Sequence, residues 1–307
     1  MNYKKKSLLF IGGTGFIGQS FFDCIRDGKL KNLKLNKIII VSRKRKIIKS
    51  KLNTKFIKSN IFSLKKLPIT DYIIYAANSS NYSENIRGIK NFKKLLNDNH
   101  KKTKILFTSS GAVYGKSSTK IKFKESEKIS IKKIHKLIGY KKNYALAKIF
   151  IENEFKELGK KGYKVIITRL FTFIGKRILL NKNYAITDLI NQAKDPKKNK
   201  ITLNSNKDVF RSYMNSEDLI RWIIAILKKA NTKCEIYNVG SDETISISKL
   251  SILISKKYKK NVYSNINKSI SKDLDYYVPS ISKVKKKLGL NLRLKLNKSL
   301  KMLDNHF

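Results

Sequence analysis

The sequence predicts an α/β protein with a doubly wound parallel sheet and a smaller second domain. Short apolar runs alternate with helical patterns in the first half of the chain, a glycine-rich turn follows the first run, and the alternation becomes irregular after about residue 171. Strands that alternate with helices form parallel sheets covered on both faces. With 307 residues, 41% of them hydrophobic, the chain can bury a large core.

The first half of the chain supplies the strands and helices of this sheet. Apolar runs with the length of buried strands lie at 7–11, 37–42, 54–59, 71–77, 103–110 and 163–170. Helical patterns follow the glycine-rich turn up to Gly28 and occupy residues 85–96 and 144–158. Farther along, residues 185–193 and 216–230 are also expected to be helical.

The glycine-rich turn GGTGFIG occupies residues 12–18, between a strand and a helix. Glycines allow positive φ angles and a close approach to a pyrophosphate, and the next helix offers free N–H groups at its N-terminus. In this context G-x-G-x-x-G is typical of a Rossmann-type dinucleotide-binding domain. The start MNYKKKSLLFIGG also imitates a secretory leader, but the glycines interrupt its apolar run and no typical cleavage site follows.

The end of the second strand indicates which dinucleotide binds. Domains that prefer NAD place an acidic residue there for the ribose 2′-hydroxyl. No Asp or Glu lies between residues 27 and 71, and the strand ends in VSRKRK. Ser42 and Arg43, assisted by Lys44 or Arg45, could bind a 2′-phosphate, which favours NADP(H) over NAD(H). The alternative is that a lysine-rich composition has simply removed the acid.

Three residues form a candidate catalytic group. Tyr144 and Lys148 are four residues apart in a helical pattern, so their side chains face the same way. A nearby ammonium favours the phenolate, so we expect a lowered pKa for Tyr144 and a role in acid–base catalysis. Ser110 ends the fifth strand, at the edge where parallel sheets bind ligands, and could bind a substrate carbonyl. An ordinary surface pair on a lysine-rich helix is the alternative.

Together, GGTGFIG, SSGAVYG and YALAK resemble the extended short-chain dehydrogenase/reductases, the NAD-dependent epimerase/dehydratase family, in the branch that acts on nucleotide sugars. The resemblance continues through residues 169–175, 210–219, 237–250 and 276–290. It implies a catalytic triad of Ser110, Tyr144 and Lys148, the last two also contacting the cofactor. Ser42 and Arg43 are cofactor contacts inferred above from the residues themselves. The further cofactor contacts that the resemblance implies are Gly12, Thr14, Gly15, Phe16, Ile17, Asn60, Ile61, Ala76 and Ala77. Asn60 is a departure, because the family usually has Asp there.

The resemblance also narrows the reaction. It implies that Arg211 binds the diphosphate of a nucleotide sugar and that Thr172 and Asn183 contact the substrate. Dehydratases of the family carry Asp-Glu where this chain has Gly111 and Ala112. The chain looks most like the reductases of NDP-4-keto-6-deoxyhexoses, such as the CDP-abequose and dTDP-fucose synthases. We therefore predict NADPH-dependent reduction of a 4-keto group, with a nucleotide-sugar 4-epimerase as the alternative.

This interpretation predicts two interwoven domains. Residues 1–170 would form the NAD(P)-binding Rossmann domain, and 171–307 would mainly bind substrate, with part of 205–245 returning to the first domain. The resemblance implies a homodimer through the helices around 84–98 and 140–158.

The formal charge of +48 raises other possibilities. Its lysines are spread along the chain without a helix-turn-helix, RNP or zinc pattern, so we expect a solvated surface and no specific nucleic-acid partner. A catalytically silent NADPH- or RNA-binding subunit remains an alternative. No apolar run approaches a membrane span, and the three histidines lack metal-ligand spacing. Cys24 and Cys234, far apart, suggest reduced thiols in a cytoplasmic protein.

Overall fold

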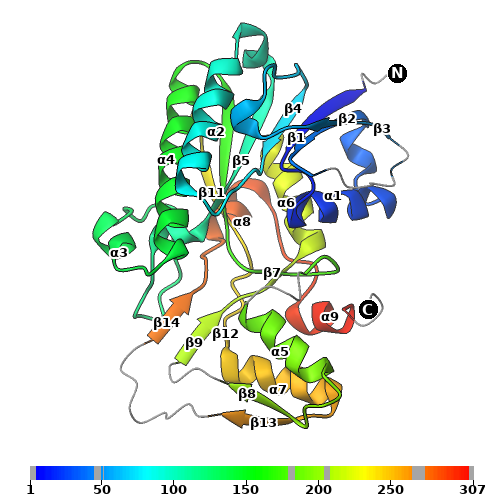
Figure 1. The fold of residues 1–307 in the computed structure, drawn as a ribbon, viewed down its shortest axis with the longest axis vertical. Helices are drawn as coiled ribbons and strands as arrows, with labels where there is room; N and C mark the ends of the chain where they lie inside the picture. The colour runs from blue at the N-terminus through cyan, green and yellow to red at the C-terminus, as the bar shows by residue number, and fades with distance from the viewer. Residues whose placement is uncertain are drawn as a thin grey trace.

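The computed structural model describes residues 5–44, 50, 52–178, 184–203, 208–264 and 274–303. Its largest element is a seven-stranded sheet in the order β11-β6-β5-β4-β1-β2-β3, in the upper half of Figure 1. Every neighbouring pair is parallel. The strands are β1 (Lys6–Ile11), β2 (Leu35–Ser42), β3 (Asn53–Lys58), β4 (Tyr72–Tyr75), β5 (Lys104–Ser110), β6 (Lys164–Leu170) and β11 (Ile236–Val239). The predicted fold class is confirmed.

Helices cover both faces of the sheet. They are α1 (Phe16–Arg26), α6 (Ser216–Leu227) and α8 (Ser282–Leu288) on one face, and α2 (Tyr82–Leu95) and α4 (Tyr140–Lys160) on the other. Strand residues alternate between the two layers: Leu8 and Phe10 of β1 face α1 and α6, whereas Leu9 and Ile11 face α2 and α4. Among the described residues, no helix combines the length and apolarity that a membrane span requires.

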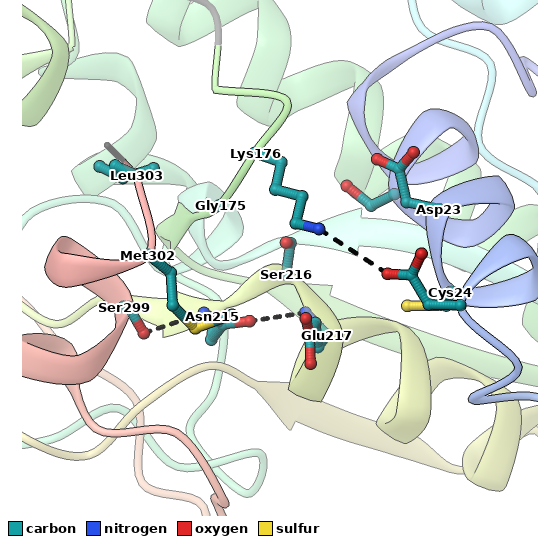
Figure 2. A pocket seen from close by; sticks show the side chains of 12 residues that line it. Asp23, Cys24, Gly175, Lys176, Asn215, Ser216, Glu217, Ser299, Met302 and Leu303 are labelled. Carbon is teal, nitrogen blue, oxygen red and sulfur yellow. Dashed lines mark hydrogen bonds and ion pairs between the residues drawn. The ribbon is translucent and has the colours of Figure 1, made fainter. Parts of the chain in front are cut away.

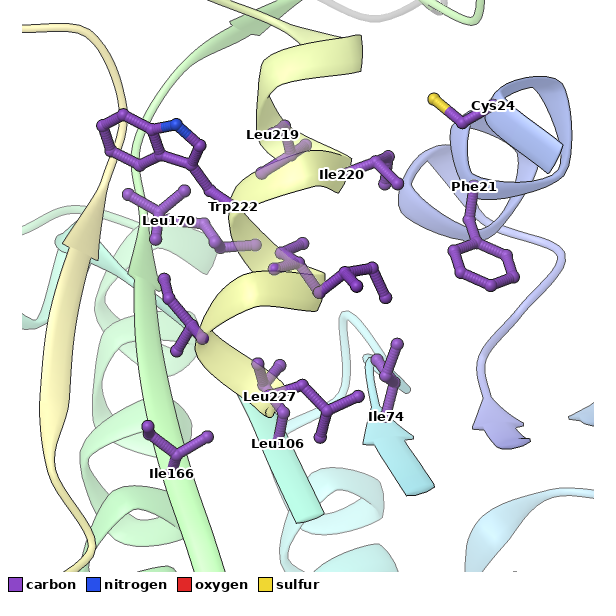
Figure 3. Close-up of a cluster of buried hydrophobic side chains, with 14 of the residues drawn as sticks. Phe21, Cys24, Ile74, Leu106, Ile166, Leu170, Leu219, Ile220, Trp222 and Leu227 are labelled. Carbon is purple, nitrogen blue, oxygen red and sulfur yellow. The ribbon is translucent and has the colours of Figure 1, made fainter. Parts of the chain in front are cut away.

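Residues from the C-terminal half complete the first layer. Figure 3 shows Trp222 of α6 beside Leu170 of β6 and, at the other end of the helix, Leu227 beside Leu106 of β5, with Phe21 of α1 on the far side of α6. Helix α6 is mostly apolar and lies beside α1 on the same face of the sheet, packed on β5 and β6. Strand β11 then extends the sheet beyond β6. The chain therefore returns to this sheet after forming part of a second unit.

The opposite layer contains a cluster of aromatic rings. The ring of Phe155 in α4 stacks on Phe107 at a centroid distance of 5.0 Å and on Phe92 at 6.1 Å. Its edge-to-face contact with Tyr75 spans 5.9 Å. Each of these side chains is almost fully buried. The cluster fixes α4 against β4 and β5, the strands that end at the candidate site.

A smaller unit lies below the sheet in Figure 1 and has a core of its own. It comprises α5 (Ala185–Lys194), β8 (Lys200–Leu203), β9 (Asp208–Arg211), β12 (Ile245–Ser246), α7 (Ile247–Tyr258), β13 (Asn261–Ser264), β14 (Leu274–Tyr277) and α9 (Leu296–Lys301). Strands β7 (Phe173–Ile174) and β10 (Met214–Asn215) pair where the chain passes between the units. The remaining short helices are α3 (Ile131–His135), η1 (Lys31–Leu33), η2 (Ile61–Ser63), η3 (Asp98–Lys102) and η4 (Gly111–Tyr114).

Ion pairs hold α1 at the junction of the two units. The carboxylate of Asp23 accepts two hydrogen bonds of 2.7 Å from Arg177, in the turn after β7. Burial alone would raise the pKa of Asp23, but the hydrogen bonds from Arg177 and Arg26 outweigh it and lower that pKa. A small cavity of about 20 Å³ lies beside Asp23. Figure 2 shows the residues that line it, among them Asn215, which donates a 2.9 Å hydrogen bond to Ser299 of α9.

Replacing Phe155 with Ala should lower the free energy of unfolding by about 3–5 kcal/mol, because it leaves a cavity among three packed rings. Urea unfolding followed by circular dichroism measures the change. The control is Ile138→Ala, because Ile138 is 88% exposed and should shift stability by less than about 0.5 kcal/mol. Equal losses in the two variants would contradict the packing that we describe.

Candidate active site

A cavity of about 260 Å³ lies at the carboxyl ends of β1, β2 and β4. This edge, where the strand order reverses, is the usual ligand crevice of doubly wound sheets. The cavity is lined by most of the predicted cofactor contacts, namely Gly12, Thr14, Gly15, Ser42, Arg43, Asn60, Ile61, Ala76 and Ala77. The side chains of Phe16 and Ile17 do not line the cavity: the ring of Phe16 stacks on Phe173 at 6.0 Å, and Ile17 packs on the core.

The turn after β1 shapes the cavity for a phosphate. Gly12 has a φ angle of +83°, and a Cβ there would lie 2.7 Å from the backbone nitrogen of Ala77. A Cβ at Gly18 would lie 2.0 Å from the carbonyl oxygen of Gly13, so the start of α1 must pack directly on the turn. Gly15 caps α1 without a side chain. The first N–H groups of the helix are therefore available to a pyrophosphate, and the residues present fit a dinucleotide.

The far edge of the cavity contains a carboxylate that sequence analysis missed. Arg43 is largely exposed, and its Nη1 lies 3.9 Å from the Oε2 of Glu84. That same oxygen accepts a 2.6 Å hydrogen bond from the hydroxyl of Ser79. The hydroxyls of Ser42 and Thr14 are 2.5 Å apart. Glu84 belongs to the first turn of α2, and its sequence position did not indicate that it would face the end of β2.

The structure brings the three candidate catalytic residues together. Ser110 ends β5 and is buried, and its Oγ accepts a 3.1 Å hydrogen bond from the N–H of Ala112. The phenol of Tyr144 in α4 lies close enough for the Ser110 hydroxyl to affect its pKa. One helical turn farther along, Lys148 Nζ lies 5.5 Å from the centroid of the Tyr144 ring and donates a 3.0 Å hydrogen bond to the carbonyl of Thr108.

The predicted lowering of the Tyr144 pKa is wrong. Burial raises the pKa of Tyr144, and the hydrogen bond from Ser110 offsets only part of that rise. Burial also lowers the pKa of Lys148 to about 8, although the carboxylate of Glu152 opposes this effect. Lys148 therefore loses its charge before the phenol ionises and cannot draw the phenol into the neutral range. At neutral pH the site holds a protonated tyrosine beside a charged lysine.

A buried polar network lies behind this site and was not predicted. The carboxylate of Glu152 accepts hydrogen bonds of 2.9 and 2.7 Å from Arg169 and one of 2.6 Å from the hydroxyl of Ser109. Arg169 also donates 2.9 Å to the hydroxyl of Tyr114, which donates 2.9 Å to Asn238. Glu152 is one turn beyond Lys148, so a fully paired carboxylate stands next to the buried ammonium.

The predicted substrate-binding residues that the structure describes are engaged in contacts within the protein. Arg211 Nη2 lies 3.0 Å from the Oδ2 of Asp275, and its Nη1 donates to two backbone carbonyls. The hydroxyl of Thr172 donates to the carbonyl of Ser212. Asn183 lies outside the described residues. The hydroxyl of Tyr277 of β14, a residue that sequence analysis did not single out, borders Gly111 at the end of β5.

Comparison with known proteins identifies the family. The profile of the NAD dependent epimerase/dehydratase family matches residues 8–240, so the chain belongs to this family. No curated protein gives a significant match.

Solved structures share the fold at low sequence identity. The NAD complex of a dTDP-glucose 4,6-dehydratase from Bacillus anthracis is 20% identical, with a TM-score of 0.78 over 97% of this chain and 96% of that one. The UDP-glucose complex of a UDP-glucose 4-epimerase from Thermotoga maritima is 19% identical, with a TM-score of 0.75 over 98% of each chain. MoeE5 in complex with UDP-glucose and NAD is 14% identical, with a TM-score of 0.74 over 98% of each chain.

Lys148→Met should stabilise the protein at neutral pH. The folded pKa of about 8 is below the unfolded value near 10.4, a difference that corresponds to about 3 kcal/mol at pH 7. Between about pH 8 and 10.4 the unfolded chain binds more protons, so stability from this group rises with pH. After subtracting the lost bond to Thr108, we expect a gain of about 1–2 kcal/mol at pH 7 that shrinks towards pH 10.

Urea unfolding of wild type and variant at both pH values measures this gain. Lys141→Met, an exposed position on the same helix, is the control and should change stability little. A gain that stays constant from pH 7 to pH 10 would show that the buried charge is not its cause.

Proposed function

We propose that the protein reduces the 4-keto group of a nucleotide-activated 6-deoxyhexose with NADPH. The support is the family assignment, the triad at the end of β5 and the similar folds that hold NAD or UDP-glucose. The strongly basic surface would also draw an anionic nucleotide sugar towards the cleft.

The protonation state of Tyr144 is the observation that favours ketone reduction over epimerisation. Reduction of a ketone needs a proton donor for the oxygen, whereas an epimerase must first remove a proton from an alcohol. Burial keeps the phenol protonated at neutral pH, which suits a donor. A phenolate base would be the better starting point for epimerisation.

In the proposed mechanism the ketone oxygen lies between Ser110 and Tyr144. The bound dihydronicotinamide supplies the hydride to C4 of the sugar. Ser110 donates a hydrogen bond that polarises the carbonyl, and Tyr144 transfers its proton to the oxygen as negative charge develops there. The ammonium of Lys148 then stabilises the phenolate until solvent returns the proton. The same ammonium, freed from Thr108, could bind a hydroxyl of the nicotinamide ribose.

Arg43 and Ser42 support NADPH as the reductant. Arg43 is exposed beside the cavity, and its distance of 3.9 Å from Glu84 is too long for a tight bidentate pair. A 2′-phosphate offers three acceptor oxygens and would compete well for this guanidinium. Reductases consume external NADPH, so this preference agrees with the proposed reaction.

A panel of NDP-4-keto-6-deoxyhexoses with NADPH tests the function. We expect loss of dihydronicotinamide absorbance and one new stereocentre at C4 by NMR of the product. Tyr144→Phe should lower kcat by at least about 100-fold, because it removes the proton donor, while the Kd for NADPH stays within about twofold. The control is Tyr140→Phe, one turn earlier on the same helix.

The epimerase alternative predicts the opposite pattern. Conversion of an NDP-hexose without added reductant, together with no reduction of any keto sugar, would replace the proposed function by 4-epimerisation. Full turnover by Tyr144→Phe would remove Tyr144 from the mechanism in either case.

Arg43→Ala should raise the Kd for NADPH by about tenfold or more and leave that for NADH within about twofold, because only NADPH carries the 2′-phosphate. Isothermal titration calorimetry measures both values. Lys55→Ala removes one positive charge from an exposed position on β3 and should affect the two cofactors equally. Tighter binding of NADH than of NADPH to the wild type would contradict the preference.

A further inference from the structure

The cavity at the carboxyl ends of β1, β2 and β4 has two charged side chains of opposite sign in its lining. Arg43 follows β2, and Glu84 lies in the first turn of α2. The other described residues that line the cavity are uncharged. In a chain with 69 basic and 21 acidic residues, the charges therefore cancel at the place where a dinucleotide would bind.

The loop before α2 holds the carboxylate of Glu84 in place. Its Oε2 accepts a 2.6 Å hydrogen bond from the hydroxyl of Ser79. Asn85 fixes Ser79 in turn, because it accepts a 2.9 Å hydrogen bond from the Ser79 N–H and donates one of 2.8 Å to the Ser79 carbonyl. An acidic side chain in the first turn of a helix is also stabilised by the helix dipole. Glu84 is thus an anion with a fixed position at the cavity.

The guanidinium of Arg43 faces this anion without being locked to it. Nη1 of Arg43 lies 3.9 Å from Oε2 of Glu84, the oxygen that already binds Ser79. The side chain of Arg43 is 59% exposed and that of Glu84 is 28% exposed. Ion pairs with this much exposure are weak, so a ligand can separate the two groups.

A 2′-phosphate needs the same guanidinium that Glu84 attracts. A phosphate carries more charge than a carboxylate and binds Arg through two parallel N–H bonds. To bind in this way it must draw Arg43 away from Glu84, and the carboxylate then loses its cationic neighbour. NADH has no such phosphate and leaves the Arg43–Glu84 contact as it is. Glu84 therefore acts against one of the two dinucleotides only.

We propose that Glu84 is a specificity-determining residue of the cofactor site, which competes with the 2′-phosphate for Arg43 and so keeps the preference for NADPH over NADH smaller than Ser42 and Arg43 alone would give. The inference rests on the proposed function, because NADPH is its reductant. The acid that is missing after β2 is then supplied from α2.

Isothermal titration calorimetry of Glu84→Gln tests this role without any sugar. Gln keeps the shape of the side chain and can still accept from Ser79, but it removes the charge. The ratio of the Kd for NADPH to the Kd for NADH should fall about threefold or more, with the Kd for NADH nearly unchanged. A smaller change, or an equal change for both dinucleotides, would overturn the proposal.

Glu157→Gln is the matched control. It removes the same charge from α4 near the residue where that helix ends, at the edge where β6 begins and opposite the cavity. Glu157 is paired with Lys160 on the surface, so this change should leave the ratio of the two Kd values as in the wild type.

An Arg43→Ala background tests whether Glu84 acts through Arg43. In this background Glu84→Gln should no longer tighten the binding of NADPH, since no guanidinium is left to compete for. An equal gain with and without Arg43 would overturn the proposed competition. Circular dichroism of each variant confirms that the fold is kept.

This proposal and the proposed function fail separately. If the wild type binds both dinucleotides but reduces no 4-keto sugar, the proposed function falls, while a lowered Kd ratio in Glu84→Gln still supports the role of Glu84. If the wild type is an active NADPH-dependent reductase and Glu84→Gln keeps the wild-type ratio, the role of Glu84 falls and the function stands.

Discussion

The burial of the Lys148 ammonium is the constraint around which the candidate site is arranged. Its Nζ has one carbonyl oxygen at 3.0 Å and the ring of Phe107 at 4.9 Å, and no carboxylate in direct contact among the described residues. A buried charge without a paired counter-ion is costly, and its pKa falls as a result. The buried ammonium of Lys148 lies beside Tyr144, where the proposed mechanism would form a transient phenolate that a cation stabilises.

Three successive residues at the end of β5 each contact a different part of the candidate site. The carbonyl of Thr108 binds Lys148, the hydroxyl of Ser109 binds Glu152, and Ser110 faces the tyrosines. Alternation along a strand would normally send Ser109 to the opposite side from its neighbours, and here that side holds the Glu152–Arg169 pair. Arg169 donates to both oxygens of the Glu152 carboxylate, and Glu152 opposes the lowering of the Lys148 pKa only partly. The end of β5 thus binds the Lys148 ammonium and the Glu152 carboxylate and carries the candidate catalytic serine.

Much of the sheet could be predicted because its signals are local. The strand expected at 37–42 is observed as Leu35–Ser42, and the helix expected at 144–158 is observed as Tyr140–Lys160. The convergence of Ser110, Tyr144 and Lys148 followed from a strand end and a helical spacing. The pKa direction of Tyr144 did not follow, because it depends on burial by residues distant in sequence. Tyr277 and Glu84 were missed for the same reason: Tyr277 reaches Gly111 at the end of β5, and Glu84 reaches the cavity at the end of β2, each through a contact between residues distant in sequence.

The carboxylate at the candidate cofactor cavity differs in its surroundings from other carboxylates of this basic chain. The chain has 21 acidic against 69 basic residues, and several acids are committed to buried contacts. Asp218 accepts from Arg221 and from two backbone N–H groups, and Glu152 is enclosed by its network. Glu84 differs, because it lies at the cofactor cavity with a hydroxyl and a distant guanidinium as its neighbours. It attracts the same Arg43 that a 2′-phosphate would need. Under the proposed function, the 2′-phosphate of NADPH would therefore compete with the Glu84 carboxylate for the Arg43 guanidinium, and the absence of an acid after β2 does not by itself decide between the two dinucleotides.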